Sequence, residues 1–443
     1  MNASTAPQGV TPGSNSAQAP TDATAIALTA SQGMRYGALG MALAFVALPL
    51  YVLLPNFYAK EFGVGLATLG AILLGARLFD ALIDPALGRL ADRLFARSAM
   101  HVLRAGAAAA VVLAIGFAAL FFPPVRDQAL LVWATVVLII TYAAYSLVSV
   151  SHQSWGARWG GDANFRARVA AWREAPGLVG VLLASTLPVV AGLPVMVSVF
   201  CILLAIGWWA WATAPRPVID SASAQLALHT QDVWHPWRNA RFRWLMAIFV
   251  LNGVASAVPA TLVLFFVQDL LQAPKAMEGV FLGVYFIAGA LAIPLWLKVL
   301  GRLGLAWGWL ASMILSIAVF IWASLLGAGD IAAYIAVCAL SGIALGADLA
   351  FPSALLTGAI AAQGDAQRHE GAYYGWWNFA TKLNMALAAG LALPLLDVFG
   401  YTPGARDTQA LQALVIAYCV LPCALKLIAS GALLIAARGR KFS

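Results

Sequence analysis

Long apolar segments alternate with short polar ones along the chain, from about residue 36 to residue 437. Each apolar segment is long enough to cross the roughly 30 Å hydrocarbon core of a bilayer as an α-helix. Twelve such helices are expected, at residues 36–58, 66–88, 103–122, 128–154, 168–191, 194–214, 243–268, 279–300, 305–326, 331–359, 371–396 and 409–437. The pattern therefore predicts an all-α membrane protein with twelve transmembrane helices.

A polar interruption in the middle of the chain divides these segments six and six. The expected organisation is a flexible cytoplasmic tail at 1–34, a six-helix half at 35–214, a cytoplasmic linker at 215–242, a second six-helix half at 243–437 and a cytoplasmic C-terminus at 438–443. Two parallel six-helix halves with a substrate site between them resemble the layout of major-facilitator transporters. We therefore expect the major-facilitator fold.

The composition is typical of a membrane protein, and the sequence contains no motif of an enzyme. Hydrophobic residues make up 62% of the chain and charged residues only 10%, against about 25% charged residues in an ordinary soluble domain. The four cysteines fall inside predicted helices without a second ligand set, which favours packing roles. No nucleophile, phosphate-loop or dinucleotide motif occurs. We expect no catalytic activity, no cofactor and no metal site; the coupling ion would be H⁺ or Na⁺.

The distribution of basic residues predicts the orientation. Most of the 26 Lys and Arg residues fall on the inner side if both termini are placed inside, as the positive-inside rule requires. The net charge of +8 is then a topology signal, and nucleic acid is not an expected partner. We expect a multi-pass protein of the inner cell membrane, acting as a monomer, with both termini in the cytoplasm.

The best clue to function is a charged stripe in the second predicted helix. Arg77, Asp80 and Asp84 lie three and four residues apart, so they share one helix face. A charge inside the bilayer costs several kcal/mol unless it is paired or functional. The stripe therefore faces other helices, although an Arg77–Asp80 ion pair could also be only structural.

Polar residues of other helices lie at neighbouring depths. At about 1.5 Å per residue, Tyr142, Tyr145 and Ser146 of the fourth helix reach the same inner half of the membrane as the two aspartates. Arg173 of the fifth helix lies near the inner surface, and Lys382 of the eleventh lies near the midplane. We expect these groups to converge on a polar interior.

Three further charges leave two interpretations open. Glu174 follows Arg173 directly, and it belongs either to the site or to the inner water layer. Asp348 either braces the tenth helix or serves the site. Lys426 is near a helix end, where its long side chain is expected to reach the membrane surface rather than to serve the site.

Three short stretches resemble one family of transporters. The segment from Arg77 to Gly88, RLFDALIDPALG, is similar to the second-helix signature of the glycoside-pentoside-hexuronide:cation symporters, a branch of the major-facilitator superfamily. The stretch GWWNFATKLNMAL around Lys382 is similar to that family's eleventh helix, and Trp172-Arg173 resembles its sugar-binding arginine. The resemblance implies that Asp80 and Asp84 bind the coupling cation.

The same resemblance implies roles for other residues. By resemblance, Arg173, Lys382 and the nearby aromatics Trp376 and Trp377 would meet the substrate. From their depth in the fourth helix, Tyr142, Tyr145 and Ser146 are expected to bind it as well. The segment from Gly88 to Arg97 resembles the loop that latches the two halves of major-facilitator proteins. It implies gating roles for Asp92, Arg93 and Arg97.

The chain departs from the family pattern beside the aspartates. Ile83 and Ala143 stand where the family carries polar residues, and Ser146 stands where it carries an aspartate or asparagine. A metal cation needs several oxygen ligands, whereas a proton needs one carboxylate. The departures favour proton over sodium coupling, with Arg77 as the neutralising partner of Asp80 and Asp84.

The combined pattern predicts a secondary active transporter. It would move a small sugar-like, polar or amphipathic solute by alternating access, with a coupling cation as the second partner and the bilayer as its surroundings. Two alternatives stay open: a proton-driven exporter of lipid-like or drug-like compounds, and a non-transporting membrane factor for assembly or delivery.

Overall fold

The computed structural model describes residues 28–126, 128–218, 232–402 and 404–439. Within these residues every regular element is helical and no strand occurs. Most of the tail expected at 1–34, the middle of the linker expected at 215–242 and residues 440–443 lie outside the described residues.

The N-terminal half contains six membrane-length rods. The first is α1 (Ala30–Leu48), which continues through the π-helical turn η1 (Pro49–Leu53) into α2 (Leu54–Phe62). The others are α3 (Leu66–Arg97), α4 (Ala99–Phe121), α5 (Gln128–Ala157), α6 (Ala163–Val190) and α7 (Gly192–Ala212). Pro49 begins the π-helical turn, where the missing proline N–H weakens the α-helical ladder.

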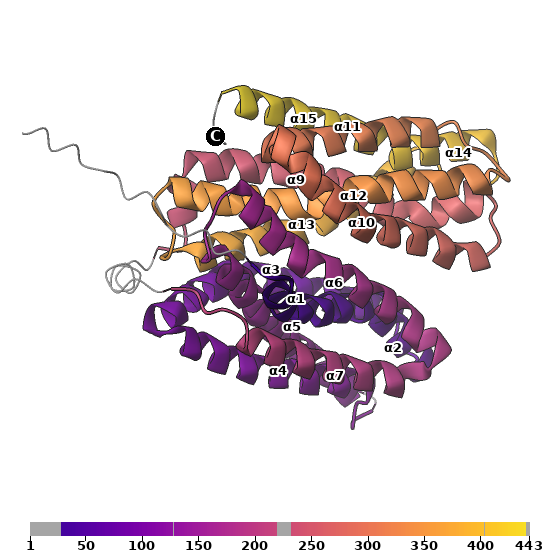
Figure 1. The fold of residues 1–443 in the computed structure, drawn as a ribbon. Helices are drawn as coiled ribbons and strands as arrows, with labels where there is room; N and C mark the ends of the chain where they lie inside the picture. Colours follow the sequence, from indigo (N-terminus) through magenta and orange to yellow (C-terminus); the bar gives the residue numbers. More distant parts are fainter. Residues whose placement is uncertain (1–27, 127, 219–231, 403, 440–443) are drawn as a thin grey trace, which may run out of the picture.

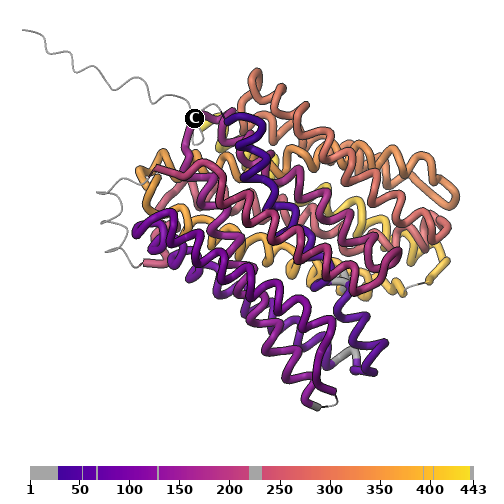
Figure 2. The backbone as a smooth tube through the Cα atoms, turned by 60° about the horizontal axis from the view of Figure 1, so that its bottom comes forward, coloured from indigo at the N-terminus to yellow at the C-terminus, as the bar shows by residue number. Residues whose placement is uncertain are grey.

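The C-terminal half also contains six rods, preceded by the short 3₁₀ helix η2 (His235–Arg238). They are α9 (Ala240–Phe265) with η3 (Phe266–Leu270), α10 (Ala276–Leu303), α11 (Leu305–Ala323), α12 (Ile331–Ala362), α13 (Glu370–Val398), and α14 (Thr408–Val415) with η4 (Ile416–Val420) and α15 (Leu421–Arg438). Figure 1 shows the two halves as separate bundles, and Figure 2 shows them side by side along their length.

Eleven of the described helical segments are long and apolar enough to cross a membrane. The twelfth rod, α3, is outside this group because its sequence carries Arg77, Asp80, Asp84, Arg89 and Asp92. It is nevertheless 32 residues long, about 48 Å at 1.5 Å per residue, and it packs against α5 and α13. The expected all-helical fold of two six-helix halves is confirmed.

The halves meet most tightly where α3 crosses α13. A Cβ atom added to Gly88 would lie 2.1 Å from the carbonyl oxygen of Gly371, and one added to Gly375 would lie 2.5 Å from that of Asp84. Only glycine allows so close an approach of two helix backbones. This contact therefore fixes the relative position of the two halves at one end of the molecule.

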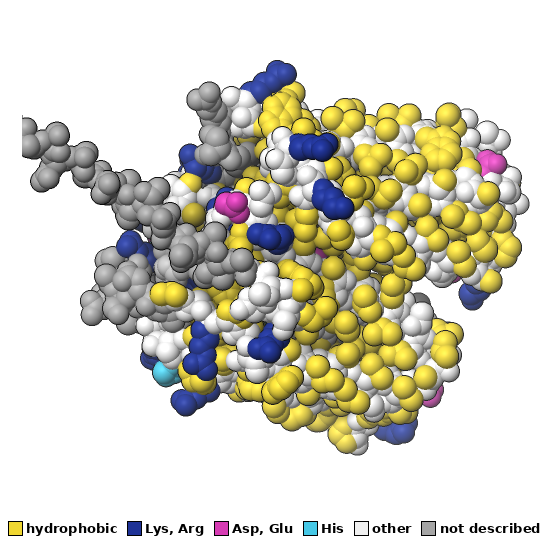
Figure 3. Space-filling view, in the orientation of Figure 1, with side chains coloured by type: hydrophobic (Ala, Val, Ile, Leu, Met, Phe, Trp, Pro, Cys, Tyr) yellow, Lys and Arg dark blue, Asp and Glu magenta, His cyan; other side chains and the backbone are white. Residues whose placement is uncertain are grey.

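The two ends of the molecule differ in charge and in how closely the two halves approach each other. Figure 3 shows most of the visible Lys and Arg side chains toward the end at the left, while a notch separates the two halves at the opposite end. The α3–α13 contact, with Arg89 and Arg158 beside it, belongs to the basic end. The molecule is thus closed at its basic end and parted at the other.

Candidate functional site

A charged cluster lies between the halves, on α3, α5 and α13. Asp80 and Asp84 are one turn apart on α3 and are 1% and 0% exposed. The ammonium nitrogen of Lys382, on α13, lies 2.7 Å from Oδ2 of each. Two buried carboxylates thus share one cation from the other half, which offsets much of the cost of burying them.

Ser146 completes this cluster from α5. Its hydroxyl donates to Oδ1 of Asp80 at 2.7 Å and accepts from Nζ of Lys382 at 2.8 Å. Oδ1 of Asp84 is buried and has no hydrogen-bond partner among the described residues. One oxygen of the site is therefore free to accept a proton or a ligand, and four of the sequence-predicted residues do come together.

Arg77 is not the direct partner of the aspartates, which corrects the expectation from its spacing. Its guanidinium carbon lies 3.6 Å from the centroid of the Tyr51 ring, and the Tyr51 ring in turn stacks on Tyr142, 6.2 Å between centroids. The π-helical turn η1 brings Tyr51 against α3, where a cation over an aromatic face is favourable. Tyr51 was missed from the sequence, although the nearby prolines could have indicated an irregular first helix.

Nε of Arg77 is buried without a hydrogen-bond partner among the described residues, and the hydroxyl of Tyr142 is close enough to Arg77 to interact with its guanidinium. A buried donor left unpaired costs about 1 to 3 kcal/mol. Such groups commonly mark a site completed by a ligand or water. The layer formed by Tyr51, Arg77 and Tyr142 therefore belongs to the candidate site.

A second polar group joins the halves through α6 and α12. Nε and Nη2 of Arg173 lie 2.9 and 2.6 Å from Oε1 of Glu174, and Nη2 lies 3.5 Å from the hydroxyl of Ser353. Glu174 is therefore the partner of Arg173, a role that the sequence left open. A cavity of about 10 Å³ beside Arg173 is lined by Tyr36, Arg166, Ser353 and Tyr374 among others, and it has room for about one water.

The two predicted tryptophans face away from the charged cluster. The indole nitrogen of Trp376 donates to the carbonyl of Val233 at 2.8 Å, and the ring of Trp377 stacks on Phe249 at 3.7 Å. They precede Lys382 by six and five residues, which turns them about 120° and 140° away from it on a helix. Tyr145 is half-buried against the N-terminal core. Substrate contact by these three residues stays a prediction.

Lys426 belongs to a separate polar cluster inside the C-terminal half. It is 5% exposed, and its Nζ lies 2.7 Å from Oδ1 of Asn252 and 3.1 Å from Oδ2 of Asp348. The indole of Trp309 donates to the same aspartate at 2.7 Å. The expectation that Lys426 reaches the membrane surface is wrong, because partners lie at its own depth. Asp348 braces four helices, one of the two roles considered for it.

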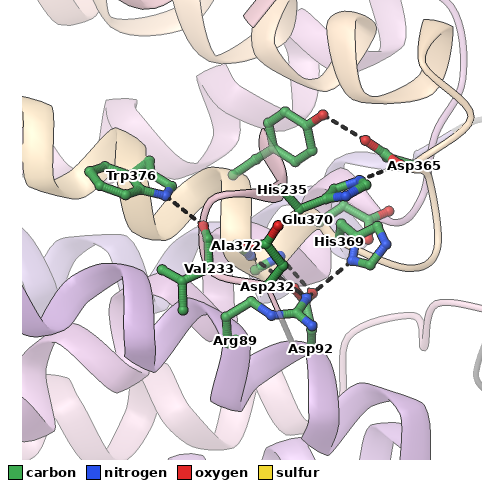
Figure 4. A network of polar contacts seen from close by, with 12 residues as sticks. Arg89, Asp92, Asp232, Val233, His235, Asp365, His369, Glu370, Ala372 and Trp376 are labelled. Carbon is green, nitrogen blue, oxygen red and sulfur yellow. Dashed lines mark hydrogen bonds and ion pairs between the residues drawn. The ribbon is translucent and has the colours of Figure 1, made fainter. Parts of the chain in front are cut away.

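The basic end carries a network that we call the latch: Arg89, Asp92, Arg158, Glu370 and the backbone amides of Gly371 and Ala372. Asp92 accepts from the two amides at 2.7 and 2.9 Å, from Arg158 at 2.9 Å and from Arg89 at 3.4 Å. Arg158 also pairs with Glu370 at 3.1 Å. Asp92 thus caps the positive N-terminus of α13 from the other half (Figure 4 shows Arg89, Asp92, Glu370 and Ala372).

The latch places Asp92 between the halves, and the arginines that contact it are Arg89 and Arg158. Arg93 and Arg97 are exposed, and no ion pair of theirs is found among the described residues. They lie on α3 beyond Asp92, whose carboxylate meets the first backbone amides of α13. Gating roles for Asp92, Arg93 and Arg97 stay predictions.

Fold and site together define a polytopic transporter with a charged site between two helical halves. The family model for MFS/sugar transport proteins matches residues 33–436, and the chain belongs to this family of major-facilitator transporters.

Two relatives from Escherichia coli K12 are similar over parts of the chain. "Inner membrane symporter YicJ" is 23% identical over 261 residues, which cover 54% of this chain and 55% of YicJ. "Putative glycoside/cation symporter YagG" is 27% identical over 169 residues, 37% of this chain and 36% of YagG. The chain thus spans about half of one relative's length and about a third of the other's.

Solved structures share the fold at low sequence identity. A bacterial homologue of the iron transporter ferroportin in an outward-facing state superposes with a TM-score of 0.68 at 14% identity, covering 92% of this chain and 99% of that one. The transporter FucP in its outward conformation gives 0.64 at 13% identity, covering 90% and 99%. These likenesses concern the fold alone.

Proposed function

We propose that the protein is a proton-coupled symporter of a small hydroxylated or anionic solute. The observation that carries the proposal is the ammonium of Lys382 held 2.7 Å from both Asp80 and Asp84. A protonated amine of the other half already fills the position that a coupling metal ion would take between the carboxylates.

The oxygen atoms around the aspartates support a proton rather than sodium. Besides the two carboxylates, Ser146 supplies one hydroxyl, while Ile83 and Ala143 supply no side-chain oxygen. A metal cation displacing Lys382 would have to find several more oxygen ligands. A proton needs only one carboxylate oxygen, and Oδ1 of Asp84 is unpaired among the described residues.

Proton uptake would change what Lys382 can bind. Neutralising Asp84 removes one of the two carboxylates that hold the ammonium, so Lys382 keeps Asp80 and Ser146 as partners and can turn its remaining donor to the solute. Arg173, on the opposite half, and Arg77 over Tyr51 supply further donors. A solute with hydroxyl or acidic groups can use all three. The relatives named as symporters, one of them of glycosides, support this class.

The asymmetry of the ends supports an alternating-access cycle. Because basic residues gather at the latch end, that end is the cytoplasmic one by the positive-inside rule, with both termini inside. The form described here is then outward-facing. Release of the latch around Asp92 would open the site inward, and a single chain would suffice for this cycle.

The test has two stages. Purified protein is screened by thermal shift against sugars, organic acids and lysolipids, with and without sodium, and each hit is then assayed for uptake into proteoliposomes. We expect a sugar or organic acid to stabilise the protein independently of sodium, and an inward proton gradient to drive its accumulation.

Three results would refute parts of the proposal. Uptake driven by a sodium gradient at constant pH, and indifferent to a proton gradient, would overturn the ion assignment. A lysolipid hit with outward transport driven by inward proton flow would make the protein an exporter. Absence of any flux, with a partner co-purifying, would make it an assembly or delivery factor.

A further inference from the structure

A group of three titratable side chains sits directly behind the latch. His235 of η2 lies against Asp365 and His369, both in the turn between α12 and α13; the candidate ligand atoms of the three lie within 4.8 Å of one another. Nε2 of His235 is 3.0 Å from Oδ1 of Asp365, and the rings of His235 and His369 are 4.3 Å apart. Figure 4 shows this group next to Arg89 and Asp92.

His369 is joined to the N-terminal half by one contact. Nη1 of Arg89, on α3, lies 3.1 Å from Nδ1 of His369. A guanidinium can only donate, so Nδ1 of His369 accepts and the proton of the neutral ring is on Nε2. The contact exists only while His369 is neutral, because an imidazolium has no acceptor and would set two cations 3.1 Å apart.

The surroundings of His369 make this contact sensitive to added charge. The charged and titratable groups that act on it are Arg89 and Asp92 from α3, His235 from η2 and Asp365 from the turn. Arg158 from α5, with Glu370 and Tyr373 from α13, contacts these groups in turn. Asp92 and Glu370 are already paired with the arginines. Asp365 accepts from His235 and, at 2.6 Å, from the hydroxyl of Tyr373.

Two imidazoles and a carboxylate could also ligate a transition metal. The geometry of His369 argues against it: with Nδ1 accepting from Arg89, Nε2 carries a proton and neither nitrogen has a free lone pair. A metal would also stand next to the Arg89 guanidinium. Proton binding is therefore the chemistry that the group favours.

We propose that His369 is a proton-sensitive catch of the latch: when neutral it accepts from Arg89 and holds the halves closed at this end, and when protonated it repels Arg89 and releases them. Adding a proton to His235 would not break its contact, because the charged ring can still donate to Asp365. Acid at the latch end would thus shift the protein toward the form that is open there.

The direction of the pH effect follows from the pKa of His369 in the closed form and in the open form. Burial lowers the pKa of His369 to about 4 in the closed form, whereas an exposed histidine titrates near pH 6.5. Despite burial, hydrogen bonds from His235 and Tyr373 hold the pKa of Asp365 below its usual value, so this carboxylate stays charged. The closed form is favoured fully above about pH 6.5 and loses its advantage as the pH falls; at pH 5.5 the closed-to-open ratio should be about tenfold lower than at pH 7.5.

The test measures the closed and open populations directly. Spin labels are placed at the exposed positions Arg93→Cys on α3 and Gln363→Cys after α12, in full-length protein whose native cysteines are replaced by alanine. Distance distributions by pulsed electron paramagnetic resonance are recorded in nanodiscs from pH 7.5 to 5.5, with EDTA present. We expect the closed-to-open ratio to fall about tenfold over this range.

His369→Gln is the decisive variant, because its amide oxygen can still accept from Arg89 but cannot be protonated. The pH response should disappear, with the latch closed throughout. His235→Gln and the exposed control His101→Gln should keep it. The proposal is overturned if the parent protein shows no response, or if His369→Gln keeps the response and His235→Gln abolishes it. It is also overturned if micromolar zinc chloride without EDTA, rather than pH, governs closure, since the group would then be a metal site.

Discussion

Nζ of Lys382 on α13 lies 2.7 Å from Oδ2 of Asp84 on α3, and this ion pair joins the two halves of the transporter at its buried centre. The same nitrogen holds Asp80 at an equal distance. In the proposed function the cluster would have two tasks: it would offer a carboxylate to the coupling ion, and it would oppose separation of the halves while both carboxylates are charged.

Asp84→Asn should abolish solute accumulation while leaving the fold intact. The amide keeps the volume of the carboxylate, and Lys382 keeps Asp80 as a partner, but the asparagine cannot carry a proton. We expect proton-driven accumulation to fall to the level of passive equilibration in proteoliposomes. Asp397→Asn, at an exposed position near the end of α13, is the matched control and should accumulate normally. Full accumulation by Asp84→Asn would remove this residue from coupling.

Lys382→Ala should destabilise the protein, because it leaves two buried carboxylates without their cation. Breaking a buried ion pair from one side costs about 3 to 5 kcal/mol. Adding Asp80→Asn to Lys382→Ala should restore part of this loss, since only one buried charge then remains. The measurement is a double-mutant cycle by thermal unfolding in detergent. Additive effects of the two substitutions would contradict direct coupling between Lys382 and Asp80.

The sequence predicted the helices well because crossing a bilayer demands long apolar segments, and these are visible without knowing the fold. It also indicated Asp80, Asp84, Ser146 and Lys382, because a charge or hydroxyl in such a segment is costly and conspicuous. What it could not give is pairing between distant helices. The expected partner of the aspartates was Arg77, a near neighbour in sequence, whereas the observed partner is 298 residues beyond Asp84.

The same limit explains two other differences. Arg93 and Arg97 resemble a gating motif, but whether an arginine meets the other half depends on where α13 begins, which no local pattern encodes. Lys426 was expected to reach the membrane surface because nothing near it in the sequence could pair with it. Its partners, Asn252 and Asp348, come from two other helices. In each case the surroundings of the side chain depend on contacts between helices that are far apart in the sequence.

Arg89→Gln should weaken closure at the basic end, and Arg93→Gln should not. Arg89 is buried and contacts both Asp92 and His369, whereas Arg93 is exposed. The measurement is the alkylation rate of a cysteine introduced at Ser353, which is buried between the halves. We expect Arg89→Gln to raise this rate several-fold. Arg93→Gln should give the same rate as the parent protein. Equal effects of the two substitutions would restore the role expected for Arg93 from the sequence.

Gly88→Ala should prevent the closed form altogether, because its methyl group would lie 2.1 Å from the carbonyl oxygen of Gly371. Backbone cannot yield by the required ångström without parting α3 from α13, so the variant should populate the form open at the basic end and lose transport. Gly75→Ala is the matched control: it lies on the same helix, and a Cβ there meets no atom within 4 Å. Replacing a helical glycine with alanine at that position should raise stability by up to about 1 kcal/mol and leave uptake unchanged. The measurements are the uptake rate and the thermal unfolding of both variants. Normal uptake by Gly88→Ala would show that transport does not require the α3–α13 contact to close.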